Sequence, residues 1–166
     1  MSAKYLIAFV ICFFLSSIPL SARLGESEMD CVFRYGIKKR QENNENIFVK
    51  DQIEIRIIFT KDKATTIRFH KAKENFNEAE IILLLDANSE GKLWEKYEKE
   101  FKNDEEKSRR YDLERYGWRF THWKRRDGVE ATYMEYHGTE KVVNQSTLLL
   151  EKMDGSKTNS MNMKGF

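Results

Sequence analysis

Residues 52–70 of the chain, QIEIRIIFTKDKATTIRFH, decide its fold class. Isoleucines alternate with polar side chains over 52–60, and this period of two is typical of a strand with one buried face. A polar Lys-Asp-Lys turn follows at 61–63. Alternation then resumes over 65–70, where isoleucine and phenylalanine share a face. The stretch therefore predicts an antiparallel β-hairpin.

A second hairpin is expected in the last third of the chain. Two β-like runs, residues 118–123 and 129–137, flank the dipeptide Asp127-Gly128. Asp-Gly between two such runs is a strong short-range signal for a hairpin. We therefore expect a second pair of antiparallel strands here.

The segments between and around these hairpins complete the expected organisation. They are a polar loop over 38–46, a buried central strand over 81–85, an amphipathic helix over 92–112, and further strands at 142–143 and 147–150. The run IILLL is typical of a strand buried on both faces, and apolar residues recurring every four positions from Leu93 predict the helix. The fold class is therefore α+β or mainly β, with an antiparallel sheet, for which a two-layer sandwich is one arrangement, and one inserted amphipathic helix.

The first 22 residues predict a secretory signal peptide. Lys4 precedes an apolar run over 5–15, and small residues follow up to Ala22. Two serines and Pro19 interrupt the run before it reaches the roughly 20 apolar residues that a membrane-spanning helix needs. We therefore expect no transmembrane segment and secretion to the extracellular space.

Cleavage after Ala22 leaves 144 of the 166 residues, a usual size for one domain. We expect that domain over 23–153 and a mobile C-terminal tail over 154–166, where small and polar residues predominate. The full chain has 29 basic and 27 acidic residues, and the loss of Lys4 brings the net charge close to +1. This balance argues against a general polyanion binder. Nucleic acid also ranks behind a protein or glycan as partner, because the ligand is expected outside the cell.

Cys31 is the one cysteine that remains after cleavage. An unpaired cysteine in an oxidising compartment predicts an intermolecular disulfide, which would link a homodimer. The alternative is a free thiol buried beside Val32 and Phe33. Asn144 begins the sequon Asn-Gln-Ser, which predicts N-glycosylation in a secreted protein.

His122 and Glu135 are the candidate catalytic residues. With a two-residue Asp-Gly turn, His122 lies opposite Tyr133, and Glu135 is its diagonal neighbour on the same face, roughly 7 Å away. A carboxylate at that distance can orient an imidazole for acid-base chemistry. His137 lies about 13 Å from His122 along the strand, so the two histidines cannot share an ion, and we expect no metal and no cofactor.

The stretch 116–126, YGWRFTHWKRR, interleaves aromatic and basic residues. Such side chains stack on sugars or bases and neutralise anionic groups. The residues predicted to bind a ligand are Trp118, Arg119, Trp123, Lys124, Arg125 and Arg126. Under the alternative interpretation, the aromatic residues build the core and the basic cluster forms a solvent-exposed turn.

The sequence thus favours a secreted, non-enzymatic binding or effector protein that recognises an extracellular glycan, anionic surface or protein through 116–126 or a sheet edge. One competing hypothesis is a small secreted hydrolase or nuclease that uses His122 and Glu135. Another is a structural protein that dimerises through Cys31. Neither a nucleophile elbow nor a phosphate-binding loop occurs in the sequence.

Overall fold

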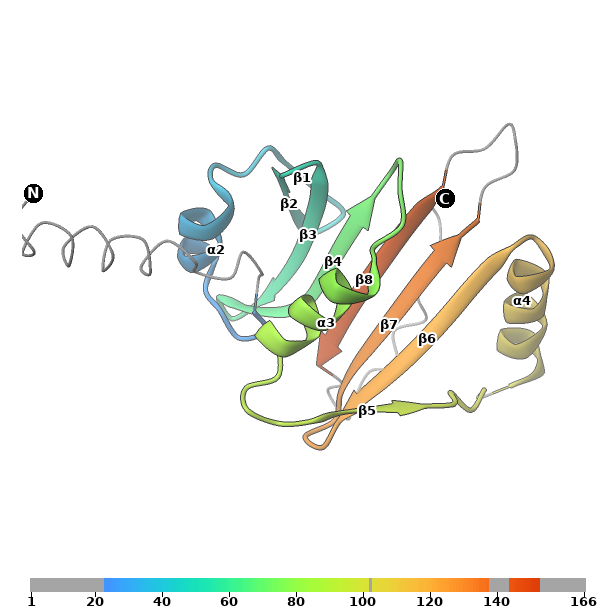
Figure 1. Cartoon of the computed structure of the whole chain (residues 1–166). Coiled ribbons are helices and arrows are strands. Elements are labelled where there is room, and N and C mark those ends of the chain that lie inside the picture. The colour runs from blue at the N-terminus through green and yellow to red at the C-terminus, as the bar shows by residue number, and fades with distance from the viewer. Residues whose placement is uncertain (1–22, 102, 138–143, 153–166) are drawn as a thin grey trace, which may run out of the picture.

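The structure, a computed structural model, describes residues 23–101, 103–137 and 144–152. Their strands form one eight-stranded antiparallel sheet in the order β1-β2-β3-β4-β8-β7-β6-β5 (Figure 1). The elements are α2 (Glu28–Tyr35), β1 (Arg40–Glu42), β2 (Glu45–Lys50), β3 (Ile53–Thr60), β4 (Lys63–Lys71), α3 (Glu78–Ala87), β5 (Trp94–Tyr97), α4 (Asp104–Arg115), β6 (Trp118–Arg125), β7 (Val129–Tyr136) and β8 (Gln145–Lys152). The predicted fold class is confirmed, with a single sheet and with three helices in the described residues instead of one.

Several predictions concern other parts of the chain. The signal peptide at 1–22, the strand at 142–143 and the tail at 154–166 lie outside the described residues. Of the helices that the structure describes, none has the length and apolarity that a bilayer span requires.

The first four strands are joined by tight two-residue turns. Both residues of each turn have positive φ, which is the mark of the type I′ turn that suits twisted hairpins; they are Asn43 and Asn44, Asp51 and Gln52, and Lys61 and Asp62. The hairpin predicted from residues 52–70 is therefore confirmed. The loop predicted at 38–46 is wrong, because β1 is an exposed edge strand whose polar side chains give no alternation of hydropathy.

The last described strand, β8, lies in the middle of the sheet. It pairs with β4 on one side and with β7 on the other, both antiparallel. Its residues 146–150 are all buried. This strand joins the N-terminal hairpins to the C-terminal ones, so the two halves of the chain share one sheet and one core.

The two faces of the sheet differ in chemistry. We call the side that α2 and α3 cover the core face; its buried side chains include Phe48, Ile55, Ile57, Ile67, Phe69, Ala131, Tyr133, Leu148 and Leu150. Residues of α2 and α3, among them Cys31 and Leu85, belong to the same cluster. We call the other side the second face; polar side chains that alternate with the core residues lie there, including Arg56, Arg68, His70, His122, Thr132 and Thr147.

Helix α3 occupies the segment that was predicted as a central strand. Asn77 begins it with a capping box, in which its side chain accepts from the backbone N–H of Glu80 and the Glu80 carboxylate accepts from the backbone N–H of Asn77. Ile81, Leu84 and Leu85 pack against the core. The prediction of a strand over 81–85 is wrong because a continuous apolar run does not by itself distinguish a strand from a short helix.

The helix predicted over 92–112 is also wrong in its first half. Residues Trp94–Tyr97 form the edge strand β5, which pairs with β6. The indole Nε1 of Trp94 donates to the backbone oxygen of Leu85 at 2.7 Å, which holds the chain close to the end of α3. Helix α4 begins only at Asp104, where the side chain of Asn103 accepts from the backbone N–H of Glu106.

A candidate ligand-binding hollow at His122

The β6–β7 hairpin turns through three residues instead of two. Gly128, with φ of 85°, donates its backbone N–H to the carbonyl oxygen of Arg125 at 2.9 Å. A glycine with positive φ at the third loop position is the usual bulge of a three-residue hairpin loop. The extra residue moves the register by one, so His122 lies opposite Thr132 and not opposite Tyr133.

This register separates the two candidate catalytic residues. Glu135 pairs with Arg119 across the strands, which places it on the core face, whereas His122 lies on the second face. The predicted diagonal contact between His122 and Glu135 is therefore wrong. Glu135 instead accepts from the hydroxyl of Tyr133 at 3.1 Å and lies 3.2 Å from Nε2 of His137.

The six residues predicted to bind a ligand are also divided between surfaces. The second face carries Trp118 and Lys124, the core face carries Arg119, Trp123 and Arg125, and the turn carries Arg126. They do not converge on one surface, because neighbouring side chains along a strand point to opposite faces. Their individual roles in ligand binding stay predictions.

Arg125 is a structural residue of the hairpin. Its side chain is 2% exposed, and its Nε and Nη2 atoms each donate to Asp127 at 2.7 Å. Its Nη1 donates to the backbone oxygen of Asn88, and Nη2 donates to Glu90 at 3.2 Å. The hydrogen bonds from Arg125 hold the pKa of Asp127 well below its ordinary value. This side chain ties the hairpin to the end of α3 and leaves little of its charge for a ligand.

A hollow of about 790 Å³ opens where β5, α4 and β6 meet. It is lined by Lys96, Tyr97, Glu98, Lys99, Glu100, Phe101, Arg110, Glu114, Phe120, Thr121 and His122. The hollow thus shares only its last three residues with the stretch 116–126. Its volume is in the range that small-molecule sites occupy.

His122 lies buried in the wall of this hollow, with 7% of its surface exposed. Arg110 Nη1 lies 3.1 Å from its Nε2, and Thr132 Oγ1 lies 3.0 Å from its Nδ1. Because a guanidinium only donates, Nε2 is the unprotonated acceptor and Nδ1 carries the proton that is donated to Thr132. Burial, and then the charges of Arg110 and Lys99, lower the pKa of His122 to about 4. The imidazole is therefore neutral at physiological pH.

Arg110 is fixed at the hollow from three sides. Its guanidinium lies 3.5 Å from the centroid of the Phe120 ring, its Nε donates to Glu114 at 2.7 Å, and its Nη1 donates to His122. Its Nη2 makes no hydrogen bond with any described residue. A planar guanidinium that is held in one orientation suits the recognition of carboxylate, sulfate or phosphate groups.

Tyr97 and Lys99 add an aromatic ring and a second cation. The Tyr97 ring lies 5.9 Å from the His122 ring, and burial, followed by the charge of Glu130 and a hydrogen bond to it, raises the pKa of its hydroxyl. Lys99 is half-buried, whereas Glu98 and Glu100 on either side of it are exposed. Arg110 and Lys99 therefore lie near a neutral histidine, and the exposed residues Glu98 and Glu100 line the outer part of the same hollow.

This arrangement can hold an anionic group against aromatic rings, but it offers no obvious catalytic pair. The hydrogen bonds of His122 run to a cation and to a hydroxyl, so no carboxylate among the described residues orients it for proton transfer. Within residues 23–101, 103–137 and 144–152, no cluster of histidine, cysteine and carboxylate side chains has the geometry to bind a metal ion.

Cys31 faces the core from α2 with 0% exposure. Burial, and then the charge of Glu26, raise the pKa of its thiol to about 12. The predicted intermolecular disulfide is therefore not supported, because a thiol in this position reaches neither solvent nor a second chain. The thiol is free and buried, as in the alternative, but Phe33 is 85% exposed and does not help to bury it. Asn144 is exposed just before β8, and its glycosylation stays a prediction.

Sequence reasoning missed Arg110, Lys99 and Tyr97. Arg110 belongs to a highly charged stretch that gives no apolar stripe, so its contact with β6 leaves no periodic signal. Tyr97 lies four positions after Leu93, on the repeat that predicts a helix, whereas it belongs to an edge strand. Comparison of the chain with protein-family models, with curated proteins and with solved structures gives no match.

Proposed function

We propose that this protein is a secreted, non-enzymatic binding protein whose ligand combines an anionic group with an aromatic or other apolar body, and that the hollow between β5, α4 and β6 is the binding site. The anionic group is a carboxylate, sulfate or phosphate, which is the chemistry that an oriented guanidinium recognises. Secretion rests on the signal peptide predicted at residues 1–22.

The fixed orientation of Arg110 is the observation that carries this proposal. The Phe120 ring, Glu114 and His122 hold the guanidinium before any ligand arrives. Pre-orientation lowers the entropy lost on binding, because the side chain does not need to be ordered by the ligand. The neutral state of His122 supports the proposal as well, since it adds no charge of its own beside Lys96, Lys99 and Arg110, the cations that line the hollow.

The apolar part of the ligand is inferred from the rings that line the hollow. Tyr97 and Phe120 are half-buried, and Phe101 is 38% exposed. Aromatic faces of this kind contact the apolar face of a sugar or the body of a planar ligand. The proposal thus keeps the predicted class of function and moves the ligand from the six residues predicted within 116–126 to the hollow.

Two matched fluorescent probes test the proposal. 8-Anilinonaphthalene-1-sulfonate has a sulfonate on an aromatic body, and N-phenyl-1-naphthylamine has the same rings without the charge. We expect the sulfonate probe to bind saturably and Arg110→Gln to weaken it about tenfold or more, because a charge-assisted hydrogen bond contributes about 1.5–3 kcal/mol. Binding of the uncharged probe should change far less.

Arg109→Gln is the matched control. Arg109 is the neighbouring residue on α4, its side chain is 56% exposed, and it pairs with Glu105 away from the hollow. Circular dichroism of both variants checks that the fold is retained, because the sulfonate probe also binds partly unfolded protein. Equal affinity of wild type and Arg110→Gln, with both folded, would exclude the hollow as the anion site.

A further inference from the structure

Helix α3 has more apolar surface than the core covers. Its run Ile81–Leu85 places Ile81, Leu84 and Leu85 on the core side. Ile82 and Leu83 point outward and are 57% and 63% exposed. A helix that is apolar on all sides is usually buried on all sides, so adjacent exposed aliphatic residues at its centre are typical of an interaction surface.

Acidic residues flank these two side chains along the helix. Glu78 and Asp86 lie four positions before and four positions after Ile82, which places all three on one stripe. At 1.5 Å per residue, the two carboxylates are about 12 Å apart along the helix axis. Both residues are exposed, and within the described residues neither makes an ion pair. The last turn of the helix contains no basic residue.

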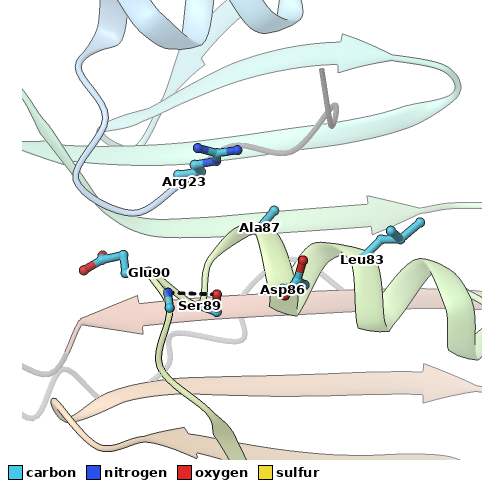
Figure 2. A pocket seen from close by; sticks show the side chains of 7 residues that line it. Arg23, Leu83, Asp86, Ala87, Ser89 and Glu90 are labelled. Atoms are coloured by element: carbon cyan, nitrogen blue, oxygen red, sulfur yellow. Dashed lines mark hydrogen bonds between the residues drawn. The ribbon is translucent and has the colours of Figure 1, made fainter. Parts of the chain in front are cut away.

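A small pocket continues the stripe at the end of α3. Its volume is about 280 Å³, and its lining includes Leu83, Asp86, Ser89 and Glu90. In Figure 2 these side chains come from the helix and the turn that follows it, and Arg23 lies in the segment that precedes α2. The pocket is smaller than most sites for drug-sized ligands and has room for a side chain.

Hydrogen bonds fix the residues around this pocket. The backbone N–H of Leu24 donates to Asn88 Oδ1 at 2.9 Å. The backbone N–H of Gly91 donates to Ser89 Oγ at 3.2 Å (Figure 2). The amide nitrogen of Asn88 donates to the backbone oxygen of Leu84 at 2.9 Å. The surface is therefore formed in the absence of a partner, which favours rigid docking.

We propose that the stripe of Glu78, Ile82, Leu83 and Asp86 is a docking surface for a basic amphipathic helix of a partner protein. The partner would place an apolar side chain on Ile82 and Leu83, and would carry Lys or Arg four positions before and four positions after it. The charges decide this choice, because the unpaired acidic residues repel an anionic membrane and also repel α3 of a second copy. The surface lies on the core-face side, apart from the ligand hollow, so this proposal does not depend on the proposed function.

Fluorescence anisotropy with a labelled 18-residue peptide of leucine and lysine, patterned as an amphipathic helix, tests this proposal. We expect saturable binding that weakens as salt increases. The double variant Ile82→Ser, Leu83→Ser should weaken it about tenfold or more, because it removes the central apolar contact. The pair Glu78→Gln, Asp86→Asn should lower both the affinity, by about threefold to tenfold, and the salt dependence.

Two controls distinguish binding at this surface from nonspecific binding of the peptide. Tyr111 on α4 is 67% exposed, so Tyr111→Ser should leave peptide binding unchanged. A peptide of leucine and glutamate with the same pattern should not bind. The proposal is overturned if the lysine peptide fails to bind, if both peptides bind equally, or if the double variant binds as well as the wild type.

Two other binding partners of this surface, a second copy of the chain and a membrane, would each give a different experimental result. A second copy of the chain would give concentration-dependent dimers in light scattering that the double variant abolishes. A membrane would give co-sedimentation with vesicles of phosphatidylcholine and phosphatidylserine that depends on Ile82 and Leu83. Either result would contradict the proposed partner helix.

Discussion

Helices α3 and α4 are inserted between strands of the same sheet, yet they are held by opposite means. The ten residues of α3 are mostly apolar, and its inner side belongs to the core. The twelve residues of α4 are mostly charged, and none of them is buried. Helix α4 precedes β6 along the chain (Figure 1). Its residue Arg110 lies against Phe120 and His122 of that strand. Neither helix shows the ordinary pattern of one apolar and one polar side.

The difference explains which surface each helix leaves for a partner. A helix with apolar residues on every side packs one side against the core and leaves the other side free for docking. A helix with charged residues on every side contacts the sheet through polar and cation–π contacts such as those of Arg110, and it leaves a hollow beside it in which Arg110 is partly accessible. The comparison predicts that α3 unfolds only with the core, whereas α4 opens locally.

The largest expected effect distinguishes the two sides of α3. Leu85 is 6% exposed and Leu83 is 63% exposed, two positions apart in one helix. Leu85→Ala should lower the free energy of unfolding by about 2–4 kcal/mol, because it leaves a cavity in the core. Leu83→Ala should change it by less than about 0.5 kcal/mol. Urea denaturation measures both, and a large cost for Leu83→Ala would mean that the outer side of α3 is covered in the monomer.

The second effect concerns pH and the tether of α4. Burial and two cations lower the pKa of His122 to about 4, from an ordinary value of 6.5. The unfolded chain therefore takes up a proton at higher pH than the folded chain, and stability that is present above pH 6.5 is lost as the pH falls toward 4. The loss from this residue should be roughly 2–3 kcal/mol.

The variant His122→Gln isolates that contribution. Burial also lowers the pKa of His70, which titrates in the same direction, so the difference between wild type and variant is the quantity to measure. Urea midpoints between pH 7 and pH 4.5 should fall less steeply in the variant. Parallel pH profiles would mean that His122 takes up its proton at the same pH in the folded and in the unfolded chain. Its Nε2 would then not be held as the acceptor of a hydrogen bond from Arg110.

The third effect tests the tether directly. Arg110→Ala removes the contact with Phe120 and the hydrogen bonds to Glu114 and His122. We expect a cost of about 1–2 kcal/mol, seen mainly as faster hydrogen exchange of the amides of α4. Arg109→Ala removes only an exposed pair with Glu105 and should cost about 0.3 kcal/mol. Equal exchange in the two variants would show that other contacts hold α4.

The two helices also show what the sequence could predict. The alternating isoleucines of β3 match the buried positions of that strand, because alternation follows directly from one buried face. The run IILLL of α3 gave the wrong element, since apolar residues that face a partner surface look the same as residues that face a core. The capping box of Asn77 and Glu80 was the local signal that favours a helix here.

The candidate site was less accessible to such reasoning. Its geometry depends on one extra residue in the turn at Gly128, which exchanges the faces of an entire strand. It also depends on a contact between Arg110 and His122. Arg110 lies on a helix and His122 on a strand, so no common periodicity in the sequence links them. Long-range polar contacts of this kind are set by the register and by the docking of α4, and local sequence patterns do not encode either.

The smallest expected effect uses the same substitution at both helices. Asn77 and Asn103 are the N-cap residues of α3 and α4, and each side chain accepts a backbone N–H three residues along the chain, from Glu80 at 2.9 Å and from Glu106 at 2.8 Å. Replacement of an N-cap asparagine by alanine costs about 1 kcal/mol of helix stability. Asn77→Ala should lower the global free energy of unfolding by that amount, because α3 and the core unfold together. Asn103→Ala should leave the global free energy of unfolding almost unchanged and should speed hydrogen exchange in α4 alone. The reason is that α4 can unfold locally while the rest of the protein stays folded. Equal global costs would mean that α4 is as firmly part of the cooperative unit as α3.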